Sequence, residues 1–209
     1  MQLVKSTGKK GEKSRQTRRR ILQAAYELFV DQGYGATTLQ GIAERAGVAV
    51  QTIYFAFGNK PSLLKELVDV TIAGDDEPIP TMQRAWLLDA LATDTAEGHL
   101  RAYVRGTCEV LQRVAPIMDV LRAAAAQDLS LASMWPQDSD PRLEVHTVAA
   151  RSLVAKPGAR ADLSVEHAAD LLYGLLSPQL YLLFVRDRGW SQDRWEQWVH
   201  DTLHAQLCG

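Results

Sequence analysis

The sequence predicts an all-α protein with a three-helix N-terminal domain and a larger helical C-terminal domain. Apolar residues recur at helical spacing along most of the chain, and no run of alternating β-branched residues predicts a strand. A Gly-, Pro- and acid-containing segment at 74–80 interrupts this pattern. We therefore expect a disordered basic arm at residues 1–13, one domain at 14–74 and another at 75–209.

Charge is unevenly distributed along the 209 residues, although the net charge is only −2. Residues 1–70 contain 11 Lys and Arg against 6 Asp and Glu, whereas the remainder contains 12 against 19. A basic front end on an acidic body is typical of a nucleic-acid-binding protein that carries a different kind of domain behind it. A solvated basic tail is the alternative explanation.

Composition argues against an exported or membrane-spanning chain. The N-terminus lacks the apolar segment of a signal peptide. No stretch reaches the roughly 18 uninterrupted apolar residues of a membrane span, and the longest candidate, 171–185, resembles a buried helix. Cys108 and Cys208 form no disulfide framework, so we expect a cytoplasmic protein.

The first helix is expected to begin at Ser14 or Thr17 and to run to about Gln32, where Gly33 ends it. One side of this helix is apolar at the spacing of a core-facing stripe. That stripe consists of Ile21, Leu22, Ala25, Leu28 and Phe29.

Two short helices joined by a tight turn are expected next. Thr37 or Thr38 can cap the first of them, and Gly47 supplies the backbone freedom needed to end it. The second covers about residues 50–55. Such a pair cannot bury its own apolar face, and its geometry suits a helix-turn-helix whose second helix enters the DNA major groove. The apolar face of the first member consists of Leu39, Ile42, Ala43 and Ala46.

Asn59 can cap a fourth helix, and further helices follow to the end of the chain. The inner face of the fourth helix is Leu63, Leu64, Leu67 and Val68. Later helices are expected near 82–93, 97–114, 116–127, 141–155, 164–186 and 191–207, with a loop at 135–141 and another helix end at 156–158.

The N-terminal pattern resembles the DNA-binding domain of the tetracycline-repressor (TetR/AcrR) family of bacterial transcriptional regulators. About a quarter of the chain carries the resemblance. It rests on Ile21–Phe29, Gly33-Tyr34, Thr37-Thr38, Ile42-Ala43, Ala46-Gly47-Val48, Thr52-Ile53-Tyr54, Phe57 and Asn59-Lys60-Pro61-Ser62-Leu63-Leu64. The resemblance implies a homodimeric repressor that binds a palindromic operator in double-stranded DNA and is released by a small-molecule effector.

Two positions depart from the family pattern. Ala49 stands where a helix-capping Ser is usual, so the recognition helix begins without a side-chain cap. Gly41 replaces a longer, often acidic residue and weakens its helix by roughly 1 kcal/mol relative to Ala.

The resemblance also implies the residues that contact DNA. Val50, Gln51 and Thr52 are the expected base-edge contacts, since Gln can bond adenine and an apolar group can pack on a thymine methyl. Tyr54, Lys60 and Thr38 are the expected phosphate contacts, with Gln40 and Arg45 as further candidates. Ordinary solvent-exposed roles are the alternative for Gln51, Tyr54 and Lys60.

Dimerisation is implied for the last two long helices, at 164–186 and 191–207. A stripe stepping by four, made of Trp195, Val199, Leu203 and Leu207, fits either an interface or the core of a single chain.

Effector binding is implied between helices of the C-terminal domain, where aromatic walls and polar groups are needed. The candidates are Trp86, Tyr103, Met118, His146 and Tyr173, together with His99 and Trp135. No catalytic constellation, metal-ligand pairing or phosphate-binding glycine loop is visible, so we expect no enzyme, cofactor or metal. A DNA-binding structural or adaptor protein of the same fold, without an effector, is the alternative, and an enzyme built on the helical domain is the third hypothesis.

Overall fold

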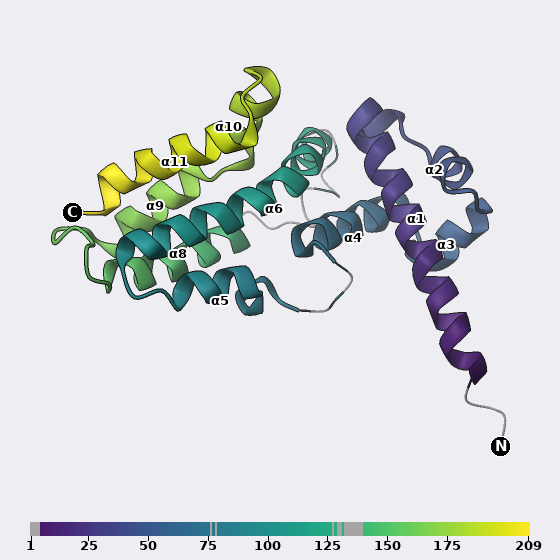
Figure 1. Cartoon of the computed structure of the whole chain (residues 1–209). Helices are drawn as coiled ribbons and strands as arrows, with labels where there is room; N and C mark the ends of the chain where they lie inside the picture. The colour runs from purple at the N-terminus through teal and green to yellow at the C-terminus, as the bar shows by residue number, and fades with distance from the viewer. Residues whose placement is uncertain (1–4, 76, 78, 127, 129–130, 132–139) are drawn as a thin grey trace. The chain divides into compact units, whose positions relative to one another are not determined.

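The computed structural model describes residues 5–75, 77, 79–126, 128, 131 and 140–209, and only the backbone of residues 5–10. Within these residues the fold is helical (Figure 1), with no strand and one isolated antiparallel bridge between Ala159 and Cys208. The predicted all-α class is confirmed.

The chain divides into two compact units. The first contains Met1–Asp69 and Val120–Met134, and the second contains Val70–Asp119 and Trp135–Gly209. The division therefore falls inside the fourth helix, and the boundary was expected within or just after that helix. It also assigns to the first unit a segment that we expected in the C-terminal domain.

The first unit is built on four helices, whose buried side chains meet in one core. These helices are α1 (Lys5–Ala36), α2 (Leu39–Ala46), α3 (Val50–Phe57) and the first part of α4 (Lys60–Ala73). The core contains Ile21, Leu22, Ala25, Phe29, Ile42, Ala46, Ile53, Phe57, Leu63, Leu64, Leu67 and Val68. The predicted apolar faces thus lie inside, except that Leu28 and Leu39 are only half-buried.

The N-terminal part of α1 differs from expectation. The helix begins at Lys5, so residues 5–13, expected as part of a disordered arm, are helical. Four lysines and Glu12 favour a helix and no proline interrupts residues 5–13, so α1 extends beyond its buried stripe although Gly8 and Gly11 each weaken it by about 1 kcal/mol. The regular part of α1 stops where predicted, because Gly33 leaves helical geometry with φ 82° and ψ 164°. Beyond this kink the helical assignment continues to Ala36.

The second unit contains the remaining helical elements. They are η1 (Thr81–Gln83), α5 (Ala85–Leu91), most of α6 (Ala96–Ala125), α8 (Pro141–Val154), α9 (Val165–Leu175), α10 (Pro178–Leu182), η2 (Leu183–Asp187) and α11 (Gln192–Leu207). Helix α9 packs against both α8 and α11. The stripe on α11 (Trp195, Val199, Leu203 and Leu207) is fully buried within the chain, so these residues form core rather than a dimer interface.

Helix α6 replaces two predicted helices. It continues through Pro116, where we expected a break between 97–114 and 116–127. An internal proline costs a helix about 3 kcal/mol. The buried Val114, Ala115 and Ile117 flank it and hold the helix in place. Of the expected loop at 135–141, residues 135–139 lie outside the described residues.

The predicted helix at 164–186 is divided. Ser177 caps α10 by accepting a hydrogen bond from the Leu180 N–H, and Pro178 occupies the first position of the new helix. The stretch Val165–Asp187 is long and apolar enough to cross a membrane by length and composition alone, with a mean hydropathy of 1.4. Only 39% of its apolar window is buried within the chain, so the expectation of a buried helix is met in part.

Candidate DNA-binding surface

The turn between α2 and α3 is fixed by local hydrogen bonds. Thr38 caps α2, because its Oγ1 accepts from the Gly41 N–H at 3.0 Å. Gly47 ends the helix in the left-handed region at φ 64°, and its N–H donates back to the carbonyls of Ala43 and Glu44. The predicted caps are thus observed, and α3 begins after a short connection.

Arg20 of α1 holds this turn from outside. Its guanidinium donates to the carbonyl of Ala46 and, at 3.2 Å, to that of Gly47. A Cβ on Gly47 would lie only 2.8 Å from the Arg20 Nη2 atom. Glycine is favoured here by its positive φ, and a Cβ would in addition make the end of the Arg20 side chain shift.

Helix α3 presents one side to the core and the other to solvent. Ile53 and Phe57 are buried, whereas Gln51 is exposed and Tyr54 is 54% exposed. Val50 and Thr52 are half-buried. Of the three expected base-edge residues, Gln51 is therefore the one whose side chain is open to a ligand. As expected from Ala49, α3 has no side-chain cap.

Arg18 anchors α3 against the rest of the unit. Its guanidinium lies 4.6 Å from the ring centroid of Phe57 and donates to the Ala56 carbonyl at 3.3 Å. It also forms an ion pair with Glu66 of α4. Because three helices meet at this side chain, the orientation of α3 is fixed in the absence of a ligand.

The ammonium group of Lys60, an expected phosphate contact, is already hydrogen-bonded within the protein. Its ammonium group donates to the carbonyls of Tyr34 and Thr37, each at 2.8 Å, and lies 4.2 Å from the centroid of the Tyr34 ring. Partial burial lowers the pKa of this lysine. Two of its three N–H donors are thus used within the protein. Asn59 caps α4 as predicted, accepting from the Ser62 N–H at 2.8 Å.

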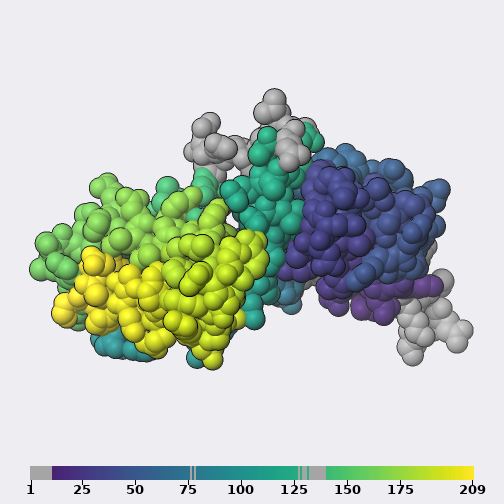
Figure 2. All heavy atoms as spheres, turned by 90° about the horizontal axis from the view of Figure 1, so that it is seen from above, coloured from purple at the N-terminus to yellow at the C-terminus, as the bar shows by residue number. Residues whose placement is uncertain are grey.

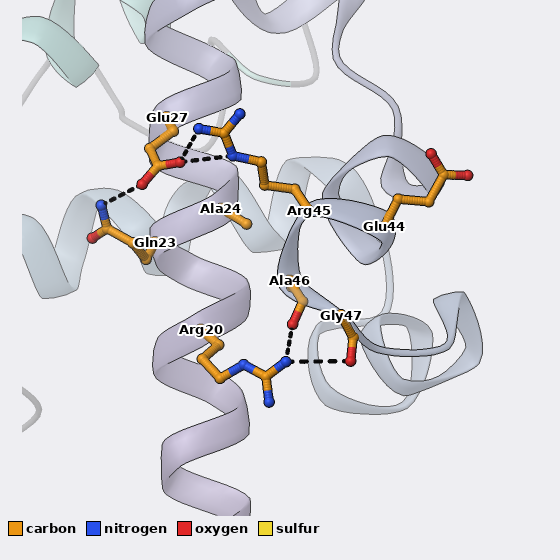
Figure 3. Close-up of a pocket in the computed structure, with 8 residues that line it drawn as sticks. All are labelled: Arg20, Gln23, Ala24, Glu27, Glu44, Arg45, Ala46 and Gly47. Carbon is orange, nitrogen blue, oxygen red and sulfur yellow. Dashed lines mark hydrogen bonds and ion pairs between the residues drawn. The ribbon is translucent and has the colours of Figure 1, made fainter.

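A hollow of about 340 Å³ lies between α1 and α2 (Figure 3). Arg45 forms an ion pair with Glu27 across it, and the Gln23 amide donates to the same carboxylate at 3.0 Å. These bonds lower the pKa of Glu27. Arg45, a further phosphate candidate, is thus held by Glu27. The lining residues are Arg20, Gln23, Ala24, Glu27, Glu44, Arg45, Ala46 and Gly47.

Comparison with known proteins places this unit in a family. The family model described as "Bacterial regulatory proteins, tetR family" matches residues 21–67. The N-terminal domain belongs to the TetR family. The match covers all of α1 after Arg20, α2, α3 and about the first half of α4, which is the region that holds all six expected DNA contacts.

Curated relatives match this TetR domain over short stretches. The HTH-type transcriptional regulator TtgR of Pseudomonas putida is 43% identical over 58 residues, which are 28% of each protein. The HTH-type transcriptional repressor BepR of Brucella suis is 28% identical over 130 residues, covering 56% of this chain and 62% of BepR. The chain thus covers less than a third of the length of relatives such as TtgR.

The fold of the whole chain is similar to that of solved structures, among them a putative TetR-family transcriptional regulator from Mesorhizobium loti, with a TM-score of 0.65 at 20% identity over 94% of this chain and 98% of that chain. A structure described as a SmeT–triclosan complex matches with a TM-score of 0.69 at 21% identity, covering 92% of each chain. Identity at this level shows the fold alone.

In the second unit, four of the five expected effector residues form one aromatic chain. The Trp86 and Tyr103 rings are 5.9 Å apart, Tyr103 and His146 are 5.8 Å apart, and His146 and Tyr173 are 6.0 Å apart. These residues come from α5, α6, α8 and α9. Met118 lies 15 residues beyond Tyr103 on α6, roughly 22 Å at the helical rise, and is separate. Trp135 lies outside the described residues.

Hydrogen bonds make this aromatic chain polar as well. The Tyr103 hydroxyl and His146 Nδ1 share a bond of 2.7 Å, and the Tyr173 hydroxyl donates to Asp140 Oδ2 at 2.6 Å. Burial, with the positive charge of Arg142, lowers the pKa of His146 to about 4. The buried imidazole is therefore neutral at physiological pH. His99 also joins the cluster, with its ring 6.0 Å from that of Tyr103.

Sequence reasoning missed three features of these sites. Arg18 and Arg20 bond the backbone carbonyls of Ala56 and Ala46, and no sequence pattern predicted these contacts. Asp140 accepts a hydrogen bond from the Tyr173 hydroxyl, and no local sequence pattern predicted this contact. Phe55 is exposed on α3 although its residue type predicts core.

Proposed function

We propose that this protein is a DNA-binding transcriptional repressor that binds a palindromic operator as a homodimer and is released by a small-molecule effector. The observation that carries the proposal is the orientation of α3. Ile53 and Phe57 fix one side of the helix in the core, and Gln51 and Tyr54 are left exposed on the other. A recognition helix that is fixed before binding loses little conformational freedom on entering the major groove.

The surroundings of α3 support DNA as the ligand. Residues 1–70 carry an excess of basic over acidic side chains, which attracts a polyanion. Asn59 already accepts the Ser62 and Leu63 N–H groups of the first turn of α4, so Lys60 at the start of this helix, with its remaining ammonium donor and the helix dipole, is the group suited to a phosphate. The match of residues 21–67 to the TetR family agrees with this assignment. We place the protein in the cytoplasm, where its operator would be.

Dimerisation through the α9–α11 side of the second unit fits the surface that this side presents. The apolar stretch Val165–Asp187 is only partly buried, and Leu183 is 47% exposed. A cluster of half-buried aromatic rings, Phe184, Trp190 and Trp198, adjoins it. Atoms of α10 and α11 lie together on one face of this unit (Figure 2). In a two-fold dimer the recognition helices would stand roughly 34–36 Å apart, one turn of DNA.

The aromatic chain in the second unit is the proposed effector site. It combines tilted and edge-to-face aromatic rings with polar groups, the composition of a small-molecule pocket. The Nε–H of Arg142 is buried there without a hydrogen-bond acceptor in the described part of the chain, and its guanidinium lies 4.4 Å from the centroid of the Tyr173 ring. The SmeT structure is described as a complex with triclosan, so a protein of this fold accepts a small aromatic molecule.

Selection of duplex DNA from a random library with the purified, full-length protein tests the proposal. We expect recovered sequences to share an inverted repeat whose half-sites are centred about one helical turn apart. Titration of a recovered duplex should show a stoichiometry that is a multiple of two chains. Failure to enrich any sequence, or enrichment of a single non-repeated half-site by a monomer, would contradict the proposed function.

A further inference from the structure

The guanidinium of Arg142, near the start of α8, differs from most charged groups of the second unit. Its Nε atom is buried, and it is the one arginine among the buried, unpaired side-chain groups of the described residues. A buried donor without an acceptor costs free energy, and the cost is higher on a charged group. Elsewhere in this unit, arginines form ion pairs with carboxylates, as at Arg84, Arg101, Arg105, Arg160 and Arg186.

The carboxylate of Asp140, two residues before Arg142, is already engaged. Its Oδ1 accepts the backbone N–H of Arg142 at 2.9 Å, and its Oδ2 accepts the Tyr173 hydroxyl at 2.6 Å. Neither of these bonds uses a guanidinium nitrogen. Within the described residues, the positive group of Arg142 therefore remains available to an anion from outside the chain.

The Tyr173 ring holds this guanidinium in place. The guanidinium carbon lies 4.4 Å from the ring centroid, and the hydroxyl of the same ring is fixed by its bond to Asp140. The positive charge also reaches the aromatic chain, because it adds to the effect of burial in lowering the pKa of His146. A guanidinium positioned in advance on an aromatic face loses little rotamer freedom when it binds an anion.

We propose that the effector is a small aromatic carboxylate whose acid group is bound by Arg142. This inference rests on the proposed function and names the chemical class of its effector. The planar fork of guanidinium N–H donors matches the two oxygens of a carboxylate. A single cation beside the Asp140 carboxylate favours a monoanion, since a phosphate dianion would be repelled more strongly. The half-buried Tyr173 ring, with the His146 ring 6.0 Å away, offers an aromatic body a surface to pack on.

Matched pairs of ligands test this class. The full-length protein is titrated by isothermal calorimetry with benzoate, phenylacetate and 2-naphthoate, with the neutral amide of each, and with phenyl phosphate as the dianion. An acid and its amide have nearly the same size and shape, so a difference between them reports the charge. We expect at least one acid to bind about tenfold more tightly than its amide, because hydrogen bonds between charged groups are the stronger ones. The same acid should weaken binding to a duplex recovered by operator selection.

Replacement of Arg142 separates an anion contact from a structural role. Arg142→Gln should lower the affinity for the acid to that of the amide and leave the affinity for the amide unchanged. Arg142→Lys keeps the charge but not the two-pronged geometry, so its affinity for the acid should be intermediate. Arg151→Gln, at an exposed position of the same helix, removes the same charge and should change nothing. A purely structural role of Arg142 would instead lower the affinities for acid and amide together.

Other results overturn the inference. It is wrong if no acid binds more tightly than its amide, if Arg142→Gln weakens acid and amide equally, or if phenyl phosphate binds more tightly than benzoate. An acid that binds through Arg142 and leaves operator affinity unchanged is not an effector, which also overturns it. In each of these cases the wild type still binds its operator, so DNA binding stands. If the wild type binds no duplex at all, the proposed function itself fails.

Discussion

The ammonium group of Lys60 donates a hydrogen bond to the Thr37 carbonyl at 2.8 Å, and the same atom binds the Tyr34 carbonyl. The first residue of α4 is thereby joined to the segment between α1 and α2. A residue expected only to contact phosphate also holds the first unit together. Stability and DNA affinity should therefore respond together when Lys60 is changed.

Lys60→Met tests this dual role. Methionine keeps most of the aliphatic stem but leaves the Tyr34 and Thr37 carbonyls without their donor, which should cost about 1–3 kcal/mol of the free energy of unfolding. Urea unfolding followed by far-UV circular dichroism measures the loss. Lys65→Met on the same helix breaks an exposed ion pair with Asp69 and should cost less than the Lys60 replacement. Equal stability of the two variants would mean that the Lys60 bonds contribute little.

Gln51 and Tyr54 should contribute to operator affinity but not to the free energy of unfolding. Gln51→Ala removes a side chain that is able to bond adenine at two points, so operator affinity should fall by roughly 1–3 kcal/mol and specificity should relax at one base pair. Tyr54→Phe removes only a hydroxyl and should weaken binding less. Anisotropy titration with labelled duplex measures both. Gln206→Ala, at an exposed position of α11, is the control. Unchanged binding by Gln51→Ala and Tyr54→Phe would refute the assignment of these residues.

The first unit was predictable in detail because its signals are local. Thr38, Gly47 and Asn59 each act on backbone groups within a few residues, so the sequence pattern alone locates the ends of α2 and the beginning of α4. The hydrogen bonds of Lys60 could not be predicted in this way. Its partners lie 23 and 26 residues away, and only the folded arrangement of α1 and α4 brings them together.

The second unit was predicted less accurately, since tertiary packing overrides local propensity there. Pro116 is a helix-breaking signal, yet buried neighbours on both sides keep α6 continuous. Pro178, an identical signal, starts a new helix because Ser177 caps it. Residue type sufficed to identify Trp86, Tyr103, His146 and Tyr173 as a possible set. Their hydrogen bonds depend on tertiary packing, since the one between Tyr103 and His146 joins α6 to α8 and the one between Tyr173 and Asp140 joins α9 to the start of α8.

Gly106 controls the position of Trp86 at one end of the aromatic chain. A Cβ added to Gly106 would lie 2.6 Å from a carbon of the Trp86 indole, so the ring must move in Gly106→Ala. Overpacking of this kind costs about 1–3 kcal/mol. We expect lower stability and a shifted tryptophan emission maximum. Gly174→Ala, which has open space around its Cβ on α9, should cause neither change. An unshifted spectrum in Gly106→Ala would contradict the close contact.

His146 should make the second unit sensitive to acid. Burial lowers its pKa from 6.5 to about 4, so between these values the unfolded chain binds a proton that the folded chain does not. The corresponding stability is fully present above pH 6.5 and is lost as the pH falls towards 4, to a total of roughly 3 kcal/mol. Protonation would also place a positive charge beside Arg142.

Replacement of this histidine should flatten the pH dependence. His146→Gln keeps a group able to bond the Tyr103 hydroxyl but does not titrate, so its unfolding free energy should fall less than that of the wild type between pH 7 and pH 4.5. Tryptophan fluorescence monitors the second unit specifically, because all five tryptophans of the sequence fall within it. His99, whose pKa burial also lowers, should leave a residual slope. His167→Gln, at an exposed position of α9, should follow the wild type. Parallel pH profiles for wild type and His146→Gln would show that His146 titrates normally in the folded protein.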